Sequence, residues 1–213
     1  MRPAPGIVTF TIILANLLVY LLPRLLDGIV PAIASYEQML WNHPGNHLSL
    51  AWLAQLVTAN FVHAGIIHLT INLLFVIWLC PPLERVLGSL SVVLFYLGAG
   101  VFAYLVYNAY AWLVPGQATT GGASGCVFAL ATLYTLIFPG EMVPLYGIIP
   151  IRFRYVLFLF IVSDISCWIG SLWSTWPDRL LSLNQIVHLS GAAAGLGYWF
   201  CFVRPKPPLN EGD

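Results

Sequence analysis

Charged residues are scarce in this chain. Only 8% of its 213 residues are Asp, Glu, Lys or Arg, their formal charges sum to zero, and no basic run is present. Soluble domains carry about 25% charged residues, so this chain lacks the polar surface that such a domain needs. Because no basic cluster is available to neutralise phosphates, we expect no nucleic-acid partner.

Cysteines are few, and none lies in a polar loop. The four cysteines fall inside or at the edge of apolar segments, at Cys80, Cys126, Cys167 and Cys201. This placement predicts buried thiols and argues against a disulfide framework of the kind found in small secreted domains.

Apolar residues make up 60% of the chain. They form six segments separated by polar residues, proline or glycine, and most are close to the ~20 residues that a helix needs to span a bilayer. The expected spans are residues 7–22, 58–79, 90–114, 122–138, 153–173 and 186–203. The sequence therefore predicts an all-α, polytopic membrane protein, with one domain over residues 1–213 and the lipid bilayer as its solvent.

Residues 23–57 connect the first two spans and are rich in Tyr and Trp, including Tyr36, Trp41 and Trp52. Such residues favour the membrane interface, so we expect this segment to lie in that layer. Most of the Lys and Arg residues fall on one side of six spans: Arg2, Arg85, Arg152, Arg154, Arg204 and Lys206, against Arg24 and Arg179. The positive-inside rule then predicts cytoplasmic termini. The short termini favour a bacterial inner membrane as the location.

Ser124 lies where a loop enters the fourth expected span, in the motif Gly122-Ala123-Ser124-Gly125. The unpaired backbone N–H groups of a helix N-terminus can hold a developing oxyanion, which makes this serine a candidate nucleophile. The alternative is that the small residues serve close packing of membrane helices.

His188 begins the sixth expected span and is followed by Gly191 and Gly195. These two glycines lie on roughly the same side of the helix as His188, so a helix that packs there also meets the imidazole. A serine on that neighbour would be within reach of a histidine base. The alternative is an interfacial histidine that is bonded to a loop carbonyl.

His68 and Asn72 are spaced i, i+4 and share a helix face, with His63 before them. A zinc site is not supported, because the HExxH spacing is absent and no cysteine or carboxylate is placed with these side chains. We expect neither a metal nor a cofactor. An imidazole and an amide on one face suit donation to an oxyanion, or alternatively a hydrogen-bond clamp between helices, which is the favoured interpretation for His63.

Asp164 is the only carboxylate in the middle of an expected span. An ionisable group at membrane depth is a functional candidate, and this one could orient His188 as a third member of a catalytic triad. A buried, protonated aspartate bonded to a neighbour explains it as well.

Taken together, these residues resemble the rhomboid family of intramembrane serine proteases. The resemblance covers most of the chain and rests on the segments Phe61–Asn72 and Pro82–Gly88, the motif Gly122-Ala123-Ser124-Gly125, and His188 with Gly191 and Gly195. It implies a bundle of six transmembrane helices, cytoplasmic termini, and a site that opens to the extracytoplasmic side.

The resemblance also implies roles for the candidate residues. Ser124 would be the nucleophile and His188 the general base, while His68, Asn72 and the Ser124 backbone N–H would stabilise the oxyanion. The substrates would be transmembrane segments of other proteins, cleaved near the extracytoplasmic face. No third acid is required in this scheme, which makes a catalytic role for Asp164 less expected.

Two positions depart from the family pattern. Ala54-Gln55 stand where family members often carry Trp-Arg, which leaves the anchoring of the first loop in question. Phe128 stands where a tyrosine often stacks on the catalytic imidazole, so stacking is retained and the hydroxyl is lost.

Two alternatives to a protease remain. A catalytically weak or inactive relative that binds membrane clients would be marked by loss of Ser124 or His188, and both are present. A transporter or channel would need polar residues along several helices, and few exist beyond those already named.

Overall fold

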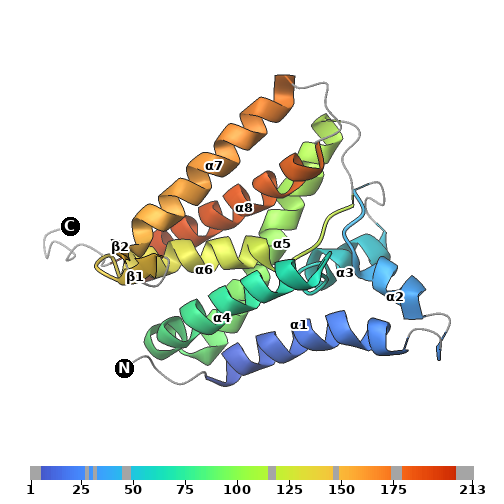
Figure 1. Cartoon of the computed structure of the whole chain (residues 1–213), viewed down its shortest axis with the longest axis horizontal. Coiled ribbons are helices and arrows are strands. Elements are labelled where there is room, and N and C mark those ends of the chain that lie inside the picture. Colours follow the sequence, from blue (N-terminus) through green and yellow to red (C-terminus); the bar gives the residue numbers. More distant parts are fainter. Residues whose placement is uncertain are drawn as a thin grey trace, which may run out of the picture.

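The computed structural model describes residues 6–26, 29–30, 33–44, 49–114, 119–145, 149–173 and 179–204. These ranges are almost entirely helical (Figure 1). The elements are α1 (Ile7–Leu26), α2 (Ile33–Leu40), α3 (Leu50–Thr58), α4 (Ile66–Leu87), α5 (Ser89–Leu113), α6 (Ser124–Ile137), β1 (Met142–Leu145), β2 (Ile149–Arg152), α7 (Phe153–Trp173), α8 (Arg179–Tyr198) and the π-helical turn η1 (Trp199–Val203).

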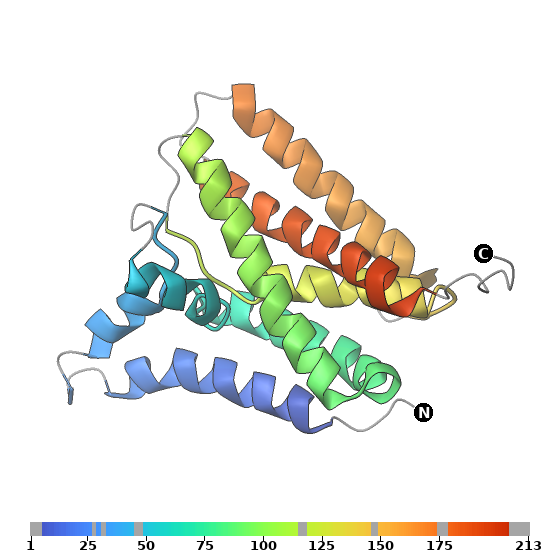
Figure 2. The same cartoon turned by 180° about the vertical axis from the view of Figure 1, so that it is seen from behind.

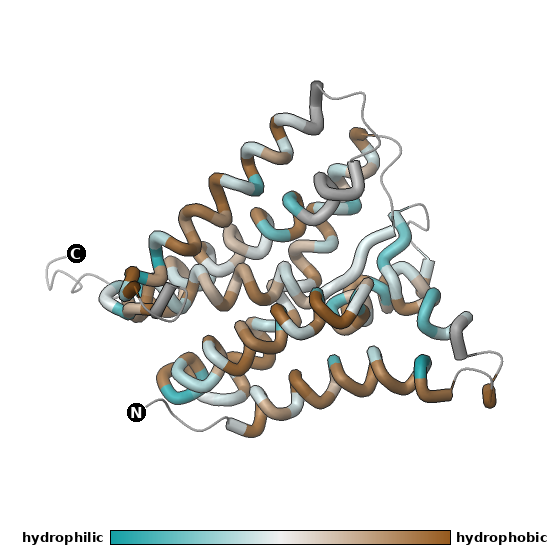
Figure 3. The backbone as a smooth tube through the Cα atoms, viewed as in Figure 1, coloured by the Kyte–Doolittle hydropathy of each residue, from teal (hydrophilic) through white to brown (hydrophobic). Residues whose placement is uncertain are grey.

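Among the described residues, five helices are long and apolar enough to cross a bilayer, namely α1, α4, α5, α7 and the segment of α8 and η1 from Gln185 to Val203. Their outward faces expose many large apolar side chains, which only lipid can cover at low cost. Figure 3 shows mostly apolar positions along α1 and α4. The predicted all-α, multi-pass membrane bundle is thus confirmed.

Helix α6 has 14 residues, so at 1.5 Å per residue it is about 21 Å long, shorter than the ~30 Å hydrocarbon layer. It lies between α4 and α8, with α1 beyond α4 and α7 beyond α8 (Figure 1). Seen from behind, α5 crosses over it (Figure 2). Surrounded by longer helices, α6 places its first residue, Ser124, within the bundle.

Glycines allow α6 and α8 to approach closely. A Cβ atom added to Gly191 would lie 2.8 Å from the carbonyl carbon of Gly125. One added to Gly195 would lie 2.5 Å from the carbonyl oxygen of Ala129. The close helix contact that the two glycines predict is therefore confirmed.

The second expected span, residues 58–79, is wrong in its position. Helix α4 runs from Ile66 to Leu87, eight residues further along at both ends. It begins after Gly65 and passes through Pro81 and Pro82, beyond the expected end at residue 79. Both prolines lie inside the helix, which ends at Leu87 and is followed by Gly88, whose φ of +82° suits glycine.

The hairpin of β1 and β2 was not expected from the sequence. The two strands pair antiparallel, with Met142 opposite Arg152, and connect α6 to α7. Pro144 and Pro150 lie opposite each other in the register. A two-stranded sheet consists only of edge strands, where proline is tolerated.

The segment before α4 is held by buried polar contacts. The Trp52 indole donates to Asn108 Oδ1 at 3.0 Å, and the Asn108 amide donates to Asn42 Oδ1 at 3.0 Å. Gln55 donates to the Met39 carbonyl and accepts from the His43 N–H, each at 3.2 Å. Gln55 therefore anchors this loop, at a position where the family often has arginine.

Candidate active site

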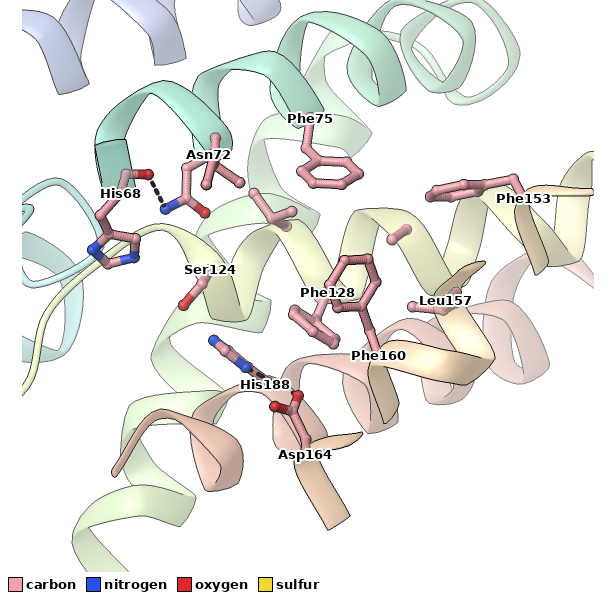
Figure 4. Close-up of a pocket in the computed structure, with 13 residues that line it drawn as sticks. His68, Asn72, Phe75, Ser124, Phe128, Phe153, Leu157, Phe160, Asp164 and His188 are labelled. Atoms are coloured by element: carbon pink, nitrogen blue, oxygen red, sulfur yellow. Dashed lines mark hydrogen bonds and ion pairs between the residues drawn. The ribbon is translucent and has the colours of Figure 1, made fainter. Parts of the chain in front are cut away.

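A cavity of about 360 Å³ opens beside the N-terminus of α6. Four helices, α4, α6, α7 and α8, supply its polar lining residues, which are His68, Asn72, Ser124, Asp164 and His188 (Figure 4). The structure thus brings together, from distant parts of the sequence, the four side chains proposed as catalytic or oxyanion-binding. The rest of the lining is apolar and includes Phe75, Phe153 and Phe160.

Ser124 and His188 face each other across the cavity, at the N-terminal end of α6 (Figure 4). The imidazole of His188 stacks on Phe128 with ring centroids 4.4 Å apart and planes 6° from parallel, so the expected stacking is confirmed. None of the hydrogen bonds between the described residues joins Ser124 to His188. Catalytic hydrogen bonds are often long in the free enzyme and tighten when substrate binds.

His68 and Asn72 approach Ser124 from α4, on the side opposite His188 (Figure 4). The Asn72 amide donates to the His68 carbonyl at 2.9 Å, which orients the side chain. An amide carries two donor hydrogens, so a second is available to a ligand in the cavity. Gly122, with φ of +138°, lies so close to His68 that an added Cβ would be 2.6 Å from its ring.

The loop that leads into α6 is tied to its surroundings by backbone contacts. Gly122 N donates to the Ala59 carbonyl at 2.8 Å, and the buried Tyr104 hydroxyl lies 3.0 Å from the Gly122 carbonyl. Asn42 and Thr120 exchange a pair of backbone hydrogen bonds at 3.0 Å each. Tyr104 and Asn42 were not predicted to be part of the site. Tyr104 is one of several tyrosines within the apolar segment 90–114, and Asn42 is one of several polar residues in a loop, so neither stands out in the sequence.

His63 lies outside the cavity, in the turn before α4. Its Nδ1 is 3.3 Å from the Phe61 carbonyl, and its Nε2 accepts from Ala123 N at 3.4 Å. Burial, and to a smaller extent the nearby His68 ring, lowers the pKa of His63 to about 4, so it is neutral at pH 7. This neutral imidazole connects the turn to the loop that carries Ser124.

Asp164 projects from α7 toward the other side of His188. Its Oδ2 lies 3.0 Å from His188 Nδ1. The sequence left two roles open for this carboxylate, and the resemblance required no acid at all. The structure identifies its hydrogen-bond partner as the imidazole. Within the described ranges, no three His, Cys, Asp or Glu side chains are grouped as metal ligands.

Comparison of the sequence with known proteins identifies its family. The family model described as the Rhomboid domain matches residues 51–205, which is most of the chain. The chain belongs to the rhomboid family. This rhomboid chain is 32% identical over 206 residues to Rhomboid-like protein 11, chloroplastic, from Arabidopsis thaliana, covering 95% of the chain and 68% of that protein.

Two further relatives of this rhomboid chain carry protease in their names. The Putative rhomboid protease YdcA of Bacillus subtilis is 28% identical over 182 residues, which is 82% of either protein. Rhomboid-type serine protease 2 of Emericella nidulans is 27% identical over 174 residues. The match covers 79% of this chain but only 31% of that longer relative.

Proposed function

We propose that this rhomboid chain is a serine endopeptidase that cleaves transmembrane segments of other proteins within the bilayer. The observation that carries the proposal is the convergence of Ser124, His188, His68 and Asn72 on one cavity at the N-terminus of a short central helix. Peptide hydrolysis by a serine needs the nucleophile itself, a nearby base and preorganised hydrogen-bond donors for the oxyanion, and these residues offer all three.

In the proposed reaction, Ser124 Oγ attacks the carbonyl carbon of the scissile peptide while His188 Nε2 takes the hydroxyl proton. The carbonyl oxygen becomes an oxyanion, which accepts hydrogen bonds from the Asn72 amide, the His68 ring and the backbone N–H of Ser124. His188 then gives its proton to the leaving amine nitrogen. A water molecule hydrolyses the acyl-serine by the same steps and restores the enzyme.

The cavity lining supports an apolar polypeptide as substrate. Beyond the polar cluster it is formed by side chains such as Phe75, Phe153 and Leu157, from α4 and α7. A transmembrane segment that unwinds locally would place its apolar side chains there and its backbone carbonyl at Ser124. Because the site lies within a bundle of apolar helices, water must enter it through the cavity.

The orientation in the membrane is also a proposal. The excess of Lys and Arg on one side of the spans supports cytoplasmic termini and an extracytoplasmic cavity. Selective labelling of single cysteines introduced at either terminus tests this orientation in intact cells. Location in a bacterial inner membrane stays a prediction, which fractionation of the source cell tests.

The alternative is a weak or inactive relative that binds membrane clients without cutting them. Cleavage of a single-span reporter protein in proteoliposomes separates the two. We expect the wild type to cleave, and Ser124→Ala and His188→Ala to lose cleavage while remaining folded. Ser190→Ala is the matched control, because this hydroxyl lies on α8 two residues from His188 and, among the described residues, bonds only the Ile186 carbonyl of its own helix, at 2.6 Å. Cleavage retained by Ser124→Ala or His188→Ala would overturn the dyad.

A further inference from the structure

The Asp164 carboxylate lies against the proposed base. Asp164 Oδ2 and His188 Nδ1 are 3.0 Å apart, and the two side chains are only 16% and 19% exposed (Figure 4). Asp164 is the one carboxylate among the described residues that line the cavity. A carboxylate at membrane depth is costly unless it has a partner, and here that partner is the imidazole.

The groups around His188 approach its ring from three directions. Phe128 of α6 covers one ring face, Ser124 of α6 and His68 of α4 lie on the cavity side, and Asp164 of α7 meets Nδ1. Ser124 and Asp164 therefore approach the imidazole from different directions, and Figure 4 shows Asp164 on the side of the ring away from Ser124.

Stacking and hydrogen bonding constrain the ring in different ways. Contact with Phe128, at 6° from parallel, fixes the plane of the imidazole but permits a 180° rotation about its Cβ–Cγ bond, which keeps this plane and exchanges the positions of ring nitrogens and ring carbons. Phenylalanine offers no hydrogen bond that could stop this rotation. A bond from Nδ1–H to Asp164 does stop it, and it also assigns the proton to Nδ1 and the lone pair to Nε2.

We infer that Asp164 is a positioning residue that holds His188 with Nε2 directed at Ser124, so that the site works as a Ser-His-Asp arrangement whose acid comes from α7. This inference rests on the proposed function. When Nε2 takes the Ser124 proton, the ring becomes an imidazolium, and the Asp164 carboxylate stabilises that charge without accepting a proton. The proton then leaves from Nε2 to the amine, and Nδ1–H stays in place throughout.

A purely structural role is the competing explanation, because the same bond also ties α7 to α8. Of the described α7 residues, only Phe153 and Leu157 are buried, so this helix has few other interior contacts. A structural role predicts that variants lose activity only in proportion to lost stability. A positioning role predicts a loss of turnover in protein that is fully folded.

The test compares Asp164→Ala, Asp164→Asn and Asp164→Glu in proteoliposomes, with kcat and KM measured separately and the Tm of each variant measured in detergent. Ser163→Ala is the matched control, because Ser163 is the preceding residue of α7, is exposed and does not line the cavity. We expect kcat to fall roughly 10- to 100-fold in the Ala and Asn variants, the value of one hydrogen bond to a charged group, with KM changed less than about twofold. We expect Asp164→Glu to recover part of the lost kcat and Ser163→Ala to match the wild type.

Three results would overturn the inference. They are wild-type kcat in Asp164→Ala, a kcat that falls only in step with Tm, and a higher kcat in Asp164→Asn, since the last would make the contact inhibitory. Failure of the proposed function looks different. In that case the wild type neither cleaves the reporter nor reacts at Ser124 with a fluorophosphonate, and both proposals are overturned together.

Discussion

Replacing Gly191 by alanine should separate the two helices that hold Ser124 and His188. The new Cβ would lie 2.8 Å from the carbonyl carbon of Gly125, and closer still to its oxygen, whereas ordinary van der Waals contact begins at 3.4 Å. Because the atoms it meets belong to backbone, α6 and α8 must move apart by at least about 0.6 Å.

Separation of the two helices should lower both the folding stability and the reaction rate. Overpacking of a well-packed interface costs about 1–3 kcal/mol of folding free energy. The site lies at the same contact, since His188 is one turn before Gly191 and Ser124 is next to Gly125. A displacement of about 1 Å costs up to ~100-fold in rate, so we expect kcat to fall by roughly 10- to 100-fold.

The assay pairs thermal unfolding in detergent with reporter cleavage in proteoliposomes. Gly197→Ala is the matched control on the same helix, because an added Cβ there meets nothing within 4 Å. We expect that variant to keep wild-type activity and to be at least as stable, since alanine is the better helix former. Wild-type Tm and kcat in Gly191→Ala, or equal damage in Gly197→Ala, would refute the reasoning.

Asn72 and His63 provide two further predictions. Asn72→Ala should lower kcat by roughly 10²- to 10³-fold with little change in KM, because an oxyanion donor acts mainly in the transition state, and near-wild-type kcat would contradict that role. The pKa of His63 is about 4 in the folded protein and 6.5 in its ordinary, unfolded setting. Between these two pH values only the unfolded state binds this proton. The free energy of unfolding should therefore be fully retained above pH 6.5 and decrease by up to about 3 kcal/mol as the pH falls toward 4. His63→Gln should flatten this dependence in pH-resolved unfolding, and a variant that keeps the wild-type slope would show that other groups cause it.

Much of the fold follows from the length and position of apolar segments. The segments 90–114 and 153–173 nearly coincide with α5 and α7, because each is bounded by residues that end a helix or leave the membrane. The start of α4 was misplaced because the apolar residues Phe61 and Val62, just before Gly65, extend the apolar stretch beyond the helix itself. The end was misplaced because prolines such as Pro81 and Pro82 usually end a helix, whereas α4 continues through both to Leu87.

The candidate site was only partly predictable. The contact of α6 with α8 could be anticipated from Gly191 and Gly195, since small residues in a membrane helix mark a close neighbour. For Asp164 the sequence left open whether its partner is His188 or another neighbour. Helix α7 is apolar around most of its circumference, so its sequence does not say which face turns inward. Only the packed structure shows that this carboxylate reaches His188.

The central claim is that Ser124 is a nucleophile activated by His188. Covalent labelling of the purified protein with a fluorophosphonate, followed by peptide mass spectrometry, tests it most directly. We predict one modified residue, Ser124, with labelling abolished in Ser124→Ala, strongly reduced in His188→Ala and unchanged in Ser190→Ala. Modification of a different serine, or equal labelling of the wild type and Ser124→Ala, would contradict the account.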